Sequence, residues 1–136
     1  MPFAQRIAAL STASLLATGV LTGAVAPPAA HASTATPTTV LLLSVEPHVD
    51  GAPRVATLRC EPAGGRHPHA ATACQNVAAV DGDLAALEVD RGPCTLEYAP
   101  VTVRALGWWR DRPVSYVETF GNRCHLLRET GTLFAF

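Results

Sequence analysis

The sequence contains no lysine, and all ten of its Lys and Arg positions are arginine. Eleven acidic residues offset them, so the formal net charge is −1 at pH 7. No basic cluster marks a surface for nucleic acid. The G-x-S-x-G motif of a nucleophilic serine is missing, and no Gly-rich phosphate-binding loop precedes a helix. We therefore expect no enzyme, no cofactor and no nucleic-acid partner.

The remaining candidates for catalytic chemistry are scattered. Ser44 and Ser115 fall inside predicted strands, where a nucleophile would lack the exposed turn that it needs. No pair of carboxylates has a spacing suited to glycoside hydrolysis. The histidines beyond the N-terminal segment are interpreted as solvated loop residues.

The N-terminus has the pattern of a secretory signal peptide. One arginine precedes an uncharged stretch, 7–26, that is rich in Ala, Leu and Val. Two prolines follow, and then Ala30-His31-Ala32 gives the small-x-small site that signal peptidase requires. The alternative is a membrane anchor, but the many Ser, Thr and Gly residues of the stretch make it a weak span. We predict a signal peptide at 1–32 and a secreted, extracellular domain at 33–136 with no membrane segment.

Four cysteines remain in that predicted mature domain: Cys60, Cys74, Cys94 and Cys124. An even number in a small exported chain favours two disulfides, and three pairings are possible. The simplest pairs Cys60 with Cys74 and Cys94 with Cys124. Each bridge would then close a loop worth roughly 3–4 kcal/mol of stability on the chain-entropy description.

A zinc site is the competing interpretation of the first two cysteines. Cys60, His67, His69 and Cys74 are residue types that bind zinc. Their spacing, Cys-x6-His-x-His-x4-Cys, matches no zinc pattern, and Pro68 stiffens the loop between the histidines. An oxidising compartment also favours pairing of the thiols with each other. We therefore predict no metal site.

Hydrophobic patterning predicts an α+β domain with an antiparallel sheet. Thr72 to Gln75 has the form of a capping box, which predicts a helix of about two turns ending at Asp81. Asp83 is placed to cap a second short helix over 84–87. Residues 121–123 are expected to form a turn. Strands are predicted over 38–45, 54–60, 98–106, 113–120 and 133–136.

The stretch CTLEYAP at 94–100 allows two interpretations. Leu96 and Tyr98 could be strand residues that face the core. Alternatively, the stretch is a rigid protease-binding loop, bracketed by Pro93 and Pro100 and held by Cys94. In that case Thr95 and Glu97 could hydrogen-bond to each other, and Gly121-Asn122 could supply an amide that braces the loop carbonyls from behind. The spacing alone favours neither interpretation.

Five stretches together resemble the Streptomyces-type subtilisin inhibitor family. They occur in the same order as in that family, cover nearly all of 38–136 and include all four cysteines. The stretches are LRCEPAGGRHPHAATAC at 58–74, VAAVDGDLAAL at 77–87, PCTLEYAPVTV at 93–103, RPVSYVETFGNRC at 112–124 and LFAF at 133–136.

The resemblance implies a five-stranded antiparallel sheet, two short helices and a homodimer formed through the sheets. It implies the disulfides Cys60–Cys74 and Cys94–Cys124. It also implies a secreted inhibitor of serine proteases, subtilisin-like or chymotrypsin-like, whose reactive bond is Leu96–Glu97. Pro93, Cys94, Thr95 and Tyr98 would complete the reactive loop, with Asn122 as its support. The alternative is a secreted dimeric binding module of the same fold without a protease target.

Overall fold

The computed structural model describes residues 36–136. The strands are β1 (Val40–Pro47), β2 (Arg54–Arg59), β3 (Gly64–Gly65), β4 (Val101–Trp109) and β5 (Arg112–Phe120). The helices are α1 (Ala70–Ala79) and α2 (Arg123–Thr130), and η1 is a single turn of 3-10 helix at Leu84–Ala86. The predicted signal peptide, 1–32, lies outside the described residues. Within 36–136, no helix has the length and hydropathy required to cross a bilayer.

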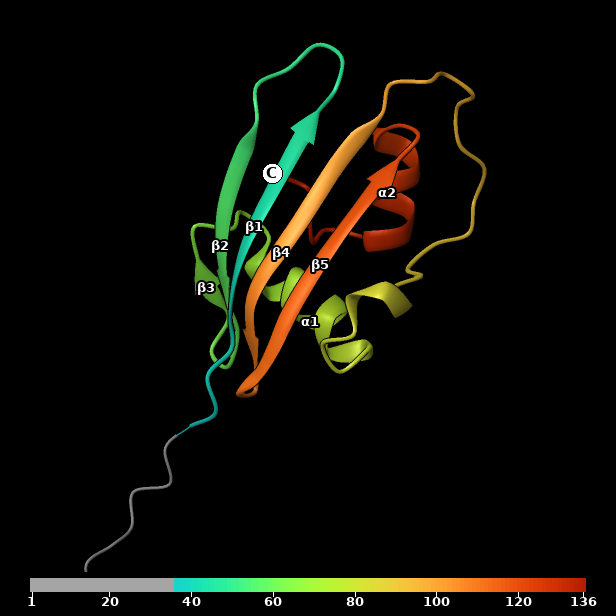
Figure 1. Ribbon diagram of the computed structural model, residues 1–136. Coiled ribbons are helices and arrows are strands. Elements are labelled where there is room, and N and C mark those ends of the chain that lie inside the picture. The colour runs from blue at the N-terminus through green and yellow to red at the C-terminus, as the bar shows by residue number, and fades with distance from the viewer. Residues whose placement is uncertain (1–35) are drawn as a thin grey trace, which may run out of the picture. The chain divides into compact units, whose positions relative to one another are not determined.

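The strands form one antiparallel sheet in the order β3-β2-β1-β4-β5 (Figure 1). The central strand β1 shows why the sequence folds this way, because its side chains alternate between the two faces. Leu41, Leu43 and Val45 are fully buried on one face. On β2, Ala56 and Leu58 pair with Leu43 and Leu41 and are buried on the same face.

Strands β4 and β5 form a hairpin through Arg110 and Asp111. Both turn residues have positive φ, 47° and 62°, as two-residue hairpin turns of type I′ require. Near the end of β4, Gly107 has φ +150°, and a Cβ there would overlap the carbonyl oxygen of Val40. The glycine therefore lets β4 approach β1 closely beside the turn.

The core lies between one face of the sheet and the helices, which lie behind the sheet in the view of Figure 1. Helix α1 contributes Ala73 and Val77, and α2 contributes Leu126. The last residues of the chain complete this layer, because Leu133 and Phe134 are fully buried. Within residues 36–136, no helix covers the opposite face of the sheet.

The expected fold class is confirmed: an antiparallel five-stranded sheet, two short helices and two disulfides. The predicted capping box is wrong. The N-cap of helix α1 lies three residues earlier than Thr72, at His69, and it makes no side-chain cap bond. Asp83 does occupy the N-cap position of η1, but it also makes no such bond.

The C-terminal end of the sequence differs most from the prediction. Residues 133–136 are not a strand but follow successive turns, in which Leu133 N donates to Thr130 O and Ala135 N to Thr132 O. The predicted turn at 121–123 leads directly into α2, which sequence analysis did not find. Strand β4 begins at Val101 rather than at Tyr98, because Pro100 cannot donate to the ladder.

Candidate functional site

The segment between η1 and β4 forms a long loop at the edge of the molecule (Figure 1). From Leu87 to Pro100 it has neither helix nor strand. Leu96 is 99% exposed and Tyr98 is 82% exposed. The interpretation in which these two side chains face the core is therefore wrong. Two large apolar side chains two residues apart are thus almost fully exposed, and Leu96 is the more exposed of them.

The disulfide Cys94–Cys124 joins this loop to the first turn of α2. The two Cα atoms are 5.6 Å apart, and 30 positions separate the cysteines in sequence. Cys94 stands two residues before Leu96, so the covalent bond fixes the chain directly ahead of the exposed side chain. The other predicted pair, Cys60–Cys74, is also formed.

Asn122 supports the loop from inside the molecule and is itself 2% exposed. Its Nδ2 donates to the carbonyl oxygens of Thr95 and Glu97, at 3.0 and 2.9 Å. These are the residues immediately before and after Leu96. The carbonyl groups on both sides of Leu96 thus point inward to one amide group, while the Leu96 side chain points into solvent.

Asn122 is also the N-cap of α2. Its Oδ1 accepts a hydrogen bond from the backbone N–H of His125, at 3.0 Å, which satisfies one of the free donors of the first turn. The asparagine side chain offers two N–H donors and one carbonyl acceptor, and the site uses all three. Aspartate would keep the cap but lose the donors, so the position requires an amide.

Backbone hydrogen bonds hold the chain after the exposed leucine. Ala99 N donates to Gly121 O at 3.0 Å, and His48 N in the β1–β2 loop donates to Pro100 O at 2.9 Å. From Val101 onward the chain belongs to β4. Both sides of Leu96 are therefore attached to the body of the protein, by a disulfide before it and by backbone bonds after it.

The predicted side-chain bond between Thr95 and Glu97 is not formed within residues 36–136. Both side chains are exposed, and their backbone carbonyls make the loop contacts instead. Pro93 is exposed at the start of the loop and Pro100 is buried at its end. The sequence correctly indicated that Gly121 and Asn122 supply contacts to the loop. It did not predict helix α2, which begins directly after Asn122.

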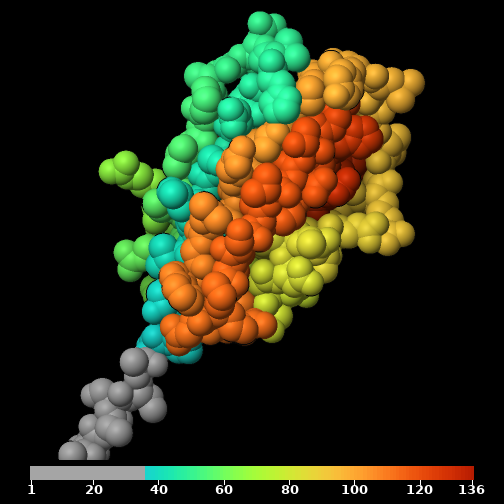
Figure 2. Space-filling view, in the orientation of Figure 1, coloured from blue at the N-terminus to red at the C-terminus, as the bar shows by residue number. Residues whose placement is uncertain are grey.

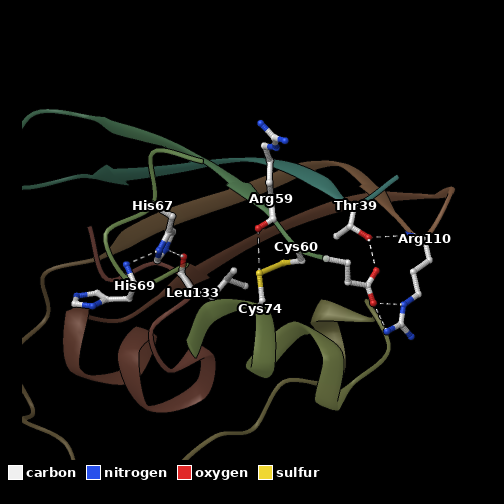
Figure 3. The surroundings of a disulfide bond; sticks show 9 residues. Thr39, Arg59, Cys60, His67, His69, Cys74, Arg110 and Leu133 are labelled. Atoms are coloured by element: carbon white, nitrogen blue, oxygen red, sulfur yellow. Dashed lines mark hydrogen bonds and ion pairs between the residues drawn. A yellow bond between two sulfur atoms is a disulfide. The ribbon is translucent and has the colours of Figure 1, made fainter. Parts of the chain in front are cut away.

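The cysteines and histidines considered for zinc have other partners (Figure 3). The disulfide occupies both sulfur atoms of Cys60 and Cys74. His67 is buried, and its Nε2 lies 2.9 Å from Leu133 O while its Nδ1 accepts from His69 N at 3.0 Å. The interpretation of this histidine as a solvated loop residue is wrong. Burial lowers the pKa of His67, and the hydrogen bond to Leu133 opposes this in part.

The family profile described as Subtilisin inhibitor-like matches residues 35–122, which is more than half of the chain. The chain belongs to the subtilisin inhibitor-like family. The description of this family as one of inhibitors agrees with the expectation that the chain is not an enzyme.

Individual members of the family are similar over different lengths. A protein of Streptomyces avermitilis is 49% identical over 78 residues, which are 57% of this chain and 53% of that protein. A subtilase-type protease inhibitor of Streptomyces coelicolor is 41% identical over 133 residues, covering 87% of this chain and 92% of that protein.

Among solved structures, the fold is similar to that of sermetstatin from Streptomyces caespitosus, determined in complex with Bacillus licheniformis subtilisin. The TM-score is 0.56 at 31% sequence identity, with 74% of this chain and 99% of that chain covered. The likeness therefore extends over nearly the whole of the solved inhibitor.

Proposed function

We propose that this protein is a secreted, tight-binding inhibitor of subtilisin-like serine proteases that presents Leu96–Glu97 as a substrate-like bond. The observation that carries the proposal is the contrast between Leu96, which is 99% exposed, and its two flanking carbonyl groups, which are held by buried Asn122. Such a loop enters an active site with little further loss of conformational entropy, and this favours tight binding. The solved complex of a related inhibitor with subtilisin supports the same partner class.

Leu96 is the proposed anchor in the specificity pocket. Its side chain is apolar and unbranched at Cβ, which suits a hydrophobic slot of the kind found in subtilisin-like and chymotrypsin-like enzymes. An interface of standard protease–inhibitor size would bury roughly 800 Å² on each partner. The rest of the contact would come from the residues around this anchor, which are Pro93, Cys94, Thr95, Glu97 and Tyr98.

The attachments on both sides of Leu96 explain how the loop would resist turnover. If a protease cut Leu96–Glu97, the new carboxyl end would stay attached through Cys94–Cys124. The new amino end would stay attached through the bond from Ala99 N to Gly121 O and through β4. The two ends would therefore remain close together, and resynthesis of the bond would compete with release.

The test of this proposal is a titration of subtilisin with the purified protein, using a chromogenic substrate, followed by mass analysis of the complex at mildly acid pH. We expect stoichiometric inhibition and slow cleavage only between Leu96 and Glu97.

Leu96→Gly should weaken inhibition by several orders of magnitude because the specificity pocket loses its occupant. Leu96→Lys should shift binding toward trypsin. An unchanged inhibition constant for Leu96→Gly would exclude this site.

Secretion is part of the proposal and rests on the N-terminal pattern of the sequence. It predicts that the protein recovered from the culture medium begins at Ser33, which intact-mass measurement would reveal. Recovery of the uncut chain from the membrane fraction would instead support the anchor.

We also propose that the protein forms a homodimer through the outer face of the sheet (Figure 2). This face carries half-exposed apolar side chains that pair across neighbouring strands, Val40 with Trp108 and Leu42 with Leu106. Contiguous apolar surface of this kind marks an interaction site. Leu42→Arg should shift the sedimentation of the protein from dimer to monomer. A wild-type protein that sediments as a monomer at micromolar concentration would contradict the dimer without affecting the loop.

A further inference from the structure

The chain that leads to the exposed leucine lies against the end of α2. We call residues 88–93 the leading arm. Val89 N donates to Glu129 O at 3.1 Å, and Asp90 N donates to Arg128 O at 2.8 Å. These carbonyls belong to the last turn of α2, where the helix itself offers no partner. The leading arm therefore completes the C-terminal end of the helix.

The side chain of Arg128 adds a second attachment to the same arm. Its guanidinium forms an ion pair with Oδ2 of Asp90, and Oδ1 of Asp90 accepts from Gly92 N at 2.9 Å. The guanidinium also lies over Gly92, because a Cβ built on that glycine would overlap it. One arginine of the helix thus contacts the arm at two positions.

Other ion pairs of the described residues do not link the arm to the body of the protein. Arg91 pairs with Glu88, so both partners lie in the arm itself, and its side chain is 79% exposed. Arg128 is 31% exposed, which is the lowest value among the ion-paired arginines of residues 36–136. Its partner Asp90 is 59% exposed, so the ion pair alone is a surface contact, and the contact of the guanidinium with Gly92 adds to it.

The leading arm needs such an attachment because it is not itself part of a helix or strand. Leu87 is buried at one end of the arm, and the disulfide at Cys94 follows its other end. Between these points the chain has no helix or strand. An extended segment bound to a protease is ordered along its length, so any freedom in the unbound arm reduces affinity.

We propose that Arg128 is a positioning residue of the inhibitor: it fixes the leading arm on α2 so that the chain before Leu96 reaches the protease already ordered. This inference rests on the proposed function and deepens it. Arg128 does not need to touch the protease to act. Its effect is carried by Asp90 and Gly92, and it should appear in the order of the arm before any protease is added.

The test compares Arg128→Ala with wild type in hydrogen exchange of the free protein and in inhibition of subtilisin. We expect the amides of Val89, Asp90 and Gly92 to exchange at least ~10-fold faster, since opening of the arm then costs less free energy. The inhibition constant should rise about tenfold, and cleavage at Leu96–Glu97 should accelerate. Gly92→Ala should act in the same direction by displacing the guanidinium, and it serves if Arg128→Ala does not fold.

Arg110→Ala is the matched control. Arg110 is also ion-paired, through Glu61, but lies in the β4–β5 turn and does not contact the arm. The Arg110→Ala variant should have a lower melting temperature, with hydrogen exchange of the arm and the inhibition constant unchanged.

If the amides of Val89, Asp90 and Gly92 exchanged as slowly in Arg128→Ala as in wild type, the proposed attachment of the arm by Arg128 would be wrong. Faster exchange with unchanged inhibition would overturn its role in binding. Failure of wild type to inhibit would instead remove the proposed function, while the exchange result would still decide whether Arg128 holds the arm.

Discussion

The two disulfides have similar Cα separations, 5.7 and 5.6 Å, but they join different kinds of structure. Cys60–Cys74 connects the end of β2 to α1, and both elements already pack against each other in the core. Cys94–Cys124 connects α2 to a segment that has no helix or strand. Cys60–Cys74 therefore reinforces elements that already pack together in the core. Cys94–Cys124 instead holds a segment that is not part of any helix or strand.

The same difference appears in the side chains around the two bonds. Near Cys60–Cys74, the polar contacts join parts of the domain to each other, such as His67 to Leu133 and Arg110 to Glu61 (Figure 3). Near Cys94–Cys124, Asn122 directs its amide at the loop. The contacts around Cys60–Cys74 therefore join parts of the domain to each other, whereas those around Cys94–Cys124 fix the segment that exposes Leu96.

Among changes that leave Leu96 in place, removing Cys94–Cys124 should have the largest effect on inhibition. The double substitution Cys94→Ser with Cys124→Ser should cost about 4 kcal/mol of unfolding free energy for a loop of this length. It should also convert the inhibitor into a substrate, because a cut at Leu96–Glu97 would release the new carboxyl end. We expect at least a ~100-fold higher inhibition constant together with rapid cleavage in mass spectrometry.

The control is Cys60→Ser with Cys74→Ser, which should cost about 3 kcal/mol. This variant should inhibit as wild type does at temperatures where it remains folded. Equal loss of inhibition in the two folded variants would show that the disulfides do not differ in the way that we describe.

Substitution of Asn122 should have an intermediate effect. Asn122→Asp keeps the acceptor that caps α2 but removes both donors to the loop, and it places a carboxylate beside two carbonyl oxygens. We expect the inhibition constant to rise roughly 10- to 100-fold, in line with two lost hydrogen bonds of about 1 kcal/mol each plus repulsion. Competition with a chromogenic substrate would measure it.

Comparison of Asn122→Ala with Asn122→Asp separates capping from loop support. The alanine removes the cap and the donors to the loop, whereas the aspartate removes only the donors. The alanine variant should lose about 1 kcal/mol more helix stability than Asn122→Asp does through the missing cap. If Asn122→Asp inhibited as strongly as wild type, the contacts to Thr95 and Glu97 would be irrelevant to loop order.

Substitution of His67 should change the pH dependence of stability and leave inhibition unchanged. Its pKa is lowered in the folded protein, chiefly by burial, so the unfolded chain binds the proton more readily. The stabilisation is therefore complete above the unfolded pKa of about 6.5 and is lost as pH falls below it. Melting temperatures from pH 8 to pH 5 should decline less steeply in His67→Gln than in wild type.

His125→Gln is the matched control, since His125 is an exposed residue of α2. It should keep the wild-type pH dependence, and both variants should inhibit normally at neutral pH. An unchanged pH profile in His67→Gln would mean that another group governs acid stability.

Sequence patterns predicted the sheet well because its signal is strong. Strand β1 is a β-branched and apolar run from Val40 to Val45 in which only Ser44 is polar, and the buried faces of β2 and β4 leave little choice of register. The position of Leu96 two residues after a cysteine also indicated the loop in which the structure exposes this side chain. Its exposure, however, could not be derived, because strand and loop interpretations of CTLEYAP fit the spacing equally.

Helix α2 was missed because it has no apolar stripe. Only Leu126 and Thr130 are buried in it, so hydrophobic periodicity gave no signal. Its end signals were nevertheless present, with Asn122 at the N-cap and Gly131 just after the last turn. The error at 133–136 has a related cause: a short apolar run indicates burial but does not decide between a strand and successive turns.

The position of Asn122 along the chain has a consequence for the newly made protein. It follows Glu97 by 25 residues, and Gly121 and Cys124 stand beside it. A growing chain therefore exposes the stretch around Leu96 before Gly121, Asn122 and Cys124, which restrain it, have been synthesised. During that interval Leu96–Glu97 lies in an unrestrained segment, and the contacts that we propose make the loop resist a protease form only with the last helix.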